Sequence, residues 1–100
     1  MNRPFYSEYV RHCARFYARN TEKPRFFNTE VDKNNWYACD RVLDNYSEQD
    51  RTIIIQVYAM RDTIADNVFW VAQTYNLDQV VIWDMLKEFE RRVAKKRGLL

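Results

Sequence analysis

The sequence predicts an all-α protein, a bundle of about five helices within one domain of 100 residues. Apolar residues recur at the three- and four-residue spacing that is typical of amphipathic helices. The chain contains only one glycine and two prolines, so few positions can interrupt a helix. In addition, a hydroxyl residue followed three positions later by an acid precedes three of the apolar runs, which indicates repeated helix starts.

The first predicted helix runs from Pro4 to about Asn20. Proline suits the first turn of a helix because its missing N–H has no partner there. A broad apolar face is expected from Phe5, Tyr6, Tyr9, Val10, Cys13, Phe16 and Tyr17. Residues 20–28 are predicted to form a loop, which Phe26 and Phe27 attach to the core.

Two helices are expected in the middle of the chain. The first begins after Thr29 and continues to about Tyr46. The second begins after Ser47 and contains three consecutive isoleucines at residues 53–55. Such a run could also form a strand, but the capping residues before it and its continuation to Met60 favour a buried helix.

The fourth and fifth predicted helices are joined by a tight turn. The fourth begins after Thr63 and ends near Tyr75, and the fifth runs from about Gln79 to Arg97, just before Gly98. Glycine commonly follows the last residue of a helix because it adopts a left-handed conformation without strain.

The turn itself has three informative residues. Asn76 tolerates the left-handed conformation that such a turn often needs, Leu77 is expected to fill the turn, and Asp78 is a suitable N-cap. On the inner side we expect Val71, Ala72, Ile82, Met85, Leu86, Phe89 and Val93. The pattern is that of a helix-turn-helix, whose second helix usually enters the DNA major groove. An antiparallel helix pair would show the same spacing.

The C-terminal half combines a polar helix start, an apolar helix, the tight turn and a basic tail. These parts are residues 47–51, residues 53–58, Val71-Ala72, Asn76-Leu77, Ile82, Met85 and residues 91–97. In this combination residues 47–97 resemble region 4 of bacterial sigma-70-type factors and related phage or mobile-element transcription regulators. The resemblance covers about half of the chain. It implies a helix-turn-helix unit over 47–100, with 1–46 as a helical brace.

The resemblance further implies that the fifth helix binds double-stranded DNA. The residues expected to face DNA are Gln79, Val80 and Trp83 at base edges, and Lys87, Arg91, Arg92 and Lys95 at the backbone. Glutamine can bind adenine through two hydrogen bonds, and a valine methyl can contact thymine. Asp78, Trp83 and Asp84 fit this role poorly, because carboxylates repel phosphates and Trp lacks a good partner in the major groove. A single module of this kind buries a modest area on DNA, so useful affinity for DNA would require a homodimer or a partner such as RNA polymerase.

Charge is distributed unevenly along the chain. The net charge of +2 conceals +4 over residues 1–25, −4 over residues 26–68 and +2 over residues 69–100. Arg11, Arg15 and Arg19 recur every four residues and would form a stripe that contacts phosphates, or simply a solvated helix face. Five bases within residues 91–97 exceed what the helix dipole alone would favour.

The alternative function is a non-enzymatic protein-interaction module or adaptor on the same scaffold. It predicts an exposed patch from Val80 to Trp83. An exposed pair of Trp70 and Trp83 would support it, because tryptophan is enriched in binding hot spots. We expect the N-terminal helix to cover Trp70, whereas the position of Trp83 stays open.

Other chemistry is not expected. Cys13 and Cys39 lack metal-ligand spacing and are predicted to be buried, reduced thiols. His12 has no neighbouring nucleophile, and the chain has no Gly-rich phosphate loop, zinc-protease motif or nucleophile elbow. We therefore expect no enzyme activity, no metal and no cofactor. No apolar run reaches membrane-spanning length and the N-terminus lacks an apolar signal core, which favours a cytoplasmic location.

Overall fold

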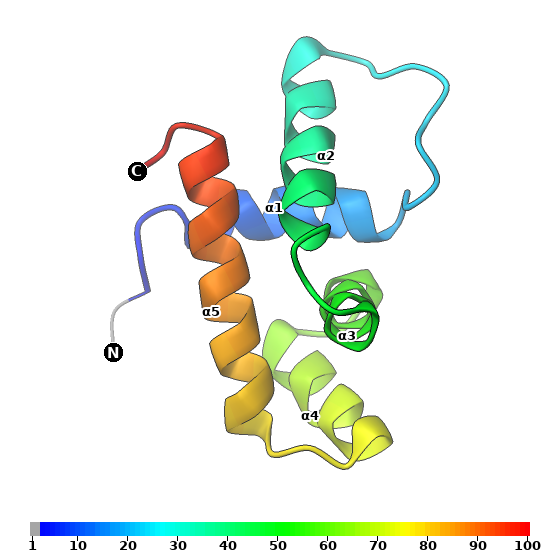
Figure 1. The fold of residues 1–100 in the computed structure, drawn as a ribbon, viewed down its shortest axis with the longest axis vertical. Coiled ribbons are helices and arrows are strands. Elements are labelled where there is room, and N and C mark those ends of the chain that lie inside the picture. The colour runs from blue at the N-terminus through cyan, green and yellow to red at the C-terminus, as the bar shows by residue number, and fades with distance from the viewer. Residues whose placement is uncertain (1–2) are drawn as a thin grey trace.

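The computed structural model describes residues 3–100 and forms five α-helices in this part of the chain, with no strand. They are α1 (Ser7–Ala18), α2 (Glu30–Leu43), α3 (Glu48–Ala59), α4 (Ile64–Tyr75) and α5 (Gln79–Lys96). In Figure 1, α5 runs along one side of the molecule, α4 lies at one end and α1 crosses behind α5 and α2. The predicted all-α class is confirmed. None of these helices has the length and apolar character needed to cross a membrane.

The hydrophobic core is organised around α5, which packs against each of the other four helices. Its inner side carries Ile82, Leu86, Phe89 and Val93, each at most 1% exposed. This confirms the predicted stripe except at Met85, which is only partly buried. The radius of gyration is 13.0 Å, as expected for a folded domain of this length.

The predicted helix starts are confirmed by side-chain caps. The hydroxyl oxygen of Thr29 accepts a hydrogen bond from the Asp32 N–H at 3.0 Å. Ser47 and Thr63 accept in the same way from the N–H groups of Asp50 and Asp66, at 3.1 and 3.2 Å. Each cap satisfies an N–H that has no partner inside the helix, and such a cap contributes about 1 kcal/mol.

The first helix differs from its prediction. Regular helix begins at Ser7 and not at Pro4, whose carbonyl accepts from the Ser7 N–H in a preceding turn. Phe5 is 79% exposed and Tyr9 is 40% exposed, so neither belongs to the buried face. The buried side is formed by the predicted residues Tyr6, Val10, Cys13 and Tyr17, together with Ala14, and α1 packs on α2 and α3. Phe5 and Tyr9 lie beside this stripe and not on it.

The connections on either side of α2 also depart from expectation. Phe27 packs against Trp36 and Tyr37 with ring centroids 6.1 and 6.3 Å apart, whereas Phe26 is 80% exposed and does not attach the loop. At its other end α2 stops at Leu43 and not near Tyr46. The Tyr46 N–H bonds to the Leu43 carbonyl three residues back, so the chain closes in a turn tighter than an α-helix.

A buried asparagine fixes the corner between α3 and α4. The Asn67 side chain is fully buried, and its Nδ2 donates to the carbonyls of Val57, Met60 and Asp62 at 2.8, 3.1 and 3.3 Å. Carbonyls at the C-terminus of a helix have no partner within the helix. The side-chain amide of Asn67, which lies on α4, therefore supplies the hydrogen-bond donor for the end of α3. The Oδ1 atom of Asn67 has no hydrogen-bond partner among residues 3–100.

Candidate functional site

The candidate site is built on the turn between α4 and α5. Asn76 is left-handed, with φ 53° and ψ 49°. The Leu77 N–H bonds to the Ala72 carbonyl at 3.0 Å and the Asn76 N–H to the Gln73 carbonyl at 3.3 Å, which is the hydrogen-bond pattern of a Schellman motif. The side chain of Asp78 then caps α5 by accepting from the Val80 N–H at 2.9 Å. All three predicted roles in this turn are confirmed, with Leu77 packed against the core.

The outward side of α5 is exposed from its first turn to its last. Gln79, Asp84, Lys87, Arg91 and Lys95 are all exposed. Val80 also projects outward, with 62% of its surface accessible. Because Lys87, Arg91 and Lys95 are four residues apart, they follow one line along the helix. The C-terminal two-thirds of this side is therefore cationic, while Asp84 interrupts its beginning.

Glu88 partly neutralises this cationic side. It forms ion pairs with Arg91 at 2.7 Å and with Arg92 at 3.0 Å. Hydrogen bonds from Arg91 and Arg92 lower the pKa of Glu88 to about 2. The guanidinium of Arg92 also lies 5.3 Å from the centre of the Tyr46 ring. Lys87 and Lys95, by contrast, pair with no carboxylate among residues 3–100.

The predicted stripe on α1 is not continuous. Arg19 is exposed and Arg15 is half-buried, but Arg11 turns inward and binds Glu90 at 3.0 Å with its side chain only 15% exposed. Arg11 lies between Ser7 and Ala14 on the helix surface, and both are buried. These two small residues leave room for the guanidinium to reach α5. Arg11 is thus unavailable to bind phosphate.

Arg11 belongs to a buried polar network that joins three helices. One oxygen of the Glu90 carboxylate accepts from Arg11 and also from the Tyr58 hydroxyl at 2.6 Å. Glu90 is 4% exposed and Tyr58 is 1% exposed. Burial, reinforced by the Glu90 carboxylate, raises the pKa of Tyr58 well above its usual value. The burial of Glu90 could have been predicted from its position, because it comes four residues after Leu86 and three before Val93 and so lies on the inner stripe.

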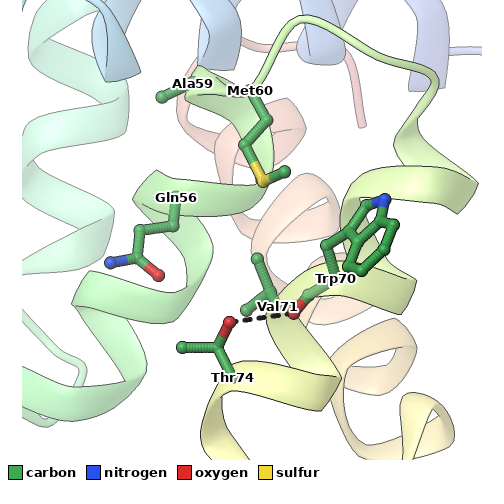
Figure 2. A pocket seen from close by; sticks show the side chains of 6 residues that line it. All are labelled: Gln56, Ala59, Met60, Trp70, Val71 and Thr74. Atoms are coloured by element: carbon green, nitrogen blue, oxygen red, sulfur yellow. Dashed lines mark hydrogen bonds between the residues drawn. The ribbon is translucent and has the colours of Figure 1, made fainter.

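The two tryptophans lie differently from expectation. Trp70 is 55% exposed, so the prediction that the N-terminal helix covers it was wrong. Figure 2 shows Trp70, Val71 and Thr74 of α4 beside Gln56, Ala59 and Met60 at the end of α3, around an open pocket of about 280 Å³. Trp83, whose position the sequence left open, is half-buried and packs against the core. It therefore does not project outward with Gln79 and Val80.

The two thiols are buried, whereas the single histidine is exposed. Cys13 and Cys39 are both free and buried. Burial raises the pKa of Cys13 to about 11 and also raises that of Cys39. Thiols in this state are poor nucleophiles because the thiolate is the reactive form. His12 is exposed, and within residues 3–100 no three His, Cys, Asp or Glu side chains are grouped to hold a metal ion.

Comparison with known proteins adds no further evidence on function. No family model, no curated protein and no solved structure matches this chain. The similarity of residues 47–97 to sigma region 4 stays a prediction from the residues quoted above. Functional conclusions therefore depend on the geometry of the turn, the charges of α5 and the exposed aromatic residues.

Proposed function

We propose that this protein is a small transcription regulator of phage or mobile-element type, which binds double-stranded DNA through the outward side of α5. One observation carries the proposal. A tight capped turn presents an 18-residue helix whose exposed side bears Lys87, Arg91 and Lys95 in one line. Helices α3, α4 and α5 all pack on one another, which is consistent with a helix-turn-helix unit in which α5 reads the groove.

Base contacts in this proposal come from the first turn of α5. Gln79 and Val80 project into solvent there, and they can address adenine and the thymine methyl respectively. Trp83 is excluded from this set because it is half-buried against the core. Asp78 is less unfavourable than its charge suggests, since its carboxylate already accepts the Val80 N–H. Asp84 remains an outward carboxylate that opposes binding.

Backbone contacts would supply most of the affinity. If Lys87, Arg91 and Lys95 each neutralise one phosphate, log K should fall against log salt with a slope of about −2.7. Affinity would then drop roughly 40-fold between 50 and 200 mM salt. Three contacts make a weak binder, because single modules bury a modest area. A second copy of the chain or RNA polymerase would be needed for tight binding.

The test is fluorescence anisotropy of labelled mixed-sequence duplex DNA at several salt concentrations. We expect saturable binding at low salt with the slope above. The double variant Arg91→Ala/Lys95→Ala should weaken binding and reduce the slope to about −0.9. The matched control is Lys23→Ala/Lys33→Ala, which also removes two positive charges but from the loop before α2 and from α2.

Two results would refute the proposal. One is absence of binding by the wild type at low salt. The other is an equal loss in the two double variants, because it would mean that affinity follows net charge and not the side of α5. Circular dichroism of each variant establishes that the helices are intact.

A second candidate function is a protein-interaction module, favoured by the exposure of Trp70. Its ring lies 5.2 Å from that of Phe69, which is 40% exposed, and beside the pocket of Figure 2. An exposed aromatic pair at the edge of an apolar pocket is typical of a binding hot spot. This function predicts that the affinity for a protein partner does not depend on salt and that Trp70→Ala abolishes binding. The DNA proposal predicts instead that affinity falls with salt and that Trp70→Ala has no effect.

A further inference from the structure

A groove lies between the outer parts of α1 and α5, next to the line of Lys87, Arg91 and Lys95. It is lined by residues between Arg3 and Arg15, by the beginning of α4 and by α5 between Trp83 and Glu90, and has a volume of about 1180 Å³. Clefts that hold organic ligands have volumes of roughly 300–1,000 Å³. The groove is therefore large enough for a small organic molecule, which would fill only part of it.

The base of the groove is apolar. Tyr6, Ile64 and Leu86 line it and are each at most 8% exposed. The half-buried Trp83 lines it from α5. An indole next to aliphatic side chains gives a flat apolar molecule both a stacking surface and van der Waals contact. The shape and chemistry of this base thus suit an aromatic ring.

Two of the carboxylates in the groove are already neutralised. Glu8 pairs with Arg3 at 2.8 Å, and Glu90 pairs with Arg11 at 3.0 Å at the buried end. These four charges cancel in pairs. Whether the groove favours an anion or a cation therefore depends on the charged residues that have no partner.

The unpaired charges of the groove are mostly positive. Arg15 on α1 and Lys87 on α5 both line it, and neither pairs with a carboxylate within residues 3–100. Asp84 is the one groove carboxylate left without a cation in the same part of the chain. The balance favours an anion held between α1 and α5.

From this combination we infer that the groove binds a small organic anion with a flat apolar body, such as an aromatic carboxylate or sulfonate. Its charged group lies between Arg15 and Lys87, and its ring lies against Trp83. This site does not depend on DNA binding, although Lys87 belongs to both surfaces. A bound anion would engage Lys87 and so lower affinity for any phosphate backbone on the other side.

The probe is naphthalene-2-sulfonate, titrated into the full chain by isothermal calorimetry in the absence of DNA. We expect one saturable site. Arg15→Gln and Lys87→Gln should each weaken binding about tenfold, because each removes a charge-assisted contact. Arg19→Gln is the matched control, since Arg19 is exposed at the C-cap of α1, four residues after Arg15, and does not line the groove. Asp84→Asn should tighten binding, because it removes the unpaired acid.

A neutral analogue separates charge from shape. The alcohol 2-naphthol has the same rings without the sulfonate, and we expect it to bind about tenfold more weakly than naphthalene-2-sulfonate. Circular dichroism establishes that each variant is folded. The inference is overturned if the wild type shows no saturable binding up to millimolar probe. It is equally overturned if Arg15→Gln and Arg19→Gln bind alike, or if 2-naphthol binds as tightly as the sulfonate.

Discussion

Replacing Asn67 with leucine is expected to lower the free energy of unfolding by about 3 kcal/mol. The Asn67 side chain is fully buried and its two N–H groups serve three carbonyls at the end of α3. Loss of these bonds costs about 2 kcal/mol, and leaving the buried Val57 carbonyl without a donor adds about 2 more. Apolar burial of leucine, together with removal of the unpartnered Oδ1, offsets about 1 kcal/mol.

Urea denaturation followed by circular dichroism measures this effect. A loss of about 3 kcal/mol moves the midpoint by roughly 1–3 M for a domain of this size. Asn45→Leu is the matched control, because Asn45 is exposed and also donates to a carbonyl, that of Arg41 at 3.4 Å. We expect a change within about 0.5 kcal/mol there. Equal effects of the two substitutions, or a loss below about 1 kcal/mol at Asn67, would refute the argument that this amide ends α3.

Three further predictions concern the ionisable groups. The pKa of Glu88, about 2 when folded, is below its usual 4.5, so its stabilisation is present above pH 4.5 and is lost as the pH falls toward 2. Glu88→Gln should therefore reduce the stability lost between pH 5 and pH 3 in urea titrations. Tyr58→Phe removes the hydroxyl that donates to Glu90 and should cost about 1.5–3 kcal/mol, as measured by thermal unfolding. Cys13 and Cys39 should react with a thiol reagent far more slowly in the native protein than in urea, and fast native labelling of either would contradict their burial.

Local signals in the sequence were sufficient for most of the fold. The caps at Thr29, Ser47 and Thr63 depend on residues three positions apart, so they can be read without knowing the tertiary structure. The same holds for Asn76 and Asp78, whose conformations follow from turn chemistry. These signals were sufficient to predict where α2, α3, α4 and α5 begin and which residues turn the chain before α5.

Tertiary placement could not be read in the same way. Phe5, Phe26 and Trp70 are large and apolar, yet they are exposed, because burial depends on which neighbour a helix face meets and not on hydrophobicity alone. Arg11 shows the converse. It is a charged residue within a basic run, but its side chain is only 15% exposed because it pairs with Glu90, 79 positions later.

The candidate site was therefore predicted in part. The resemblance to sigma region 4 predicted Lys87, Arg91, Arg92 and Lys95 as backbone contacts, and all four are exposed on α5, while their contact with DNA stays a prediction. The groove was not predicted. It is formed by α1, α4 and α5 together, and no periodicity within a single helix indicates a space between helices.

The network of Arg11, Glu90 and Tyr58 also determines how this chain can be divided. A fragment of residues 47–100 would retain Glu90 and Tyr58 but lose Arg11, and α5 would lose its contacts with α1 and α2. A buried carboxylate without its cation is destabilising by several kcal/mol, which is a large part of the stability of a small domain. We expect such a fragment to be unfolded by itself. Helices α1 and α2 would then be required for α3, α4 and α5 to fold, and we expect the smallest unit that folds by itself to contain all five helices.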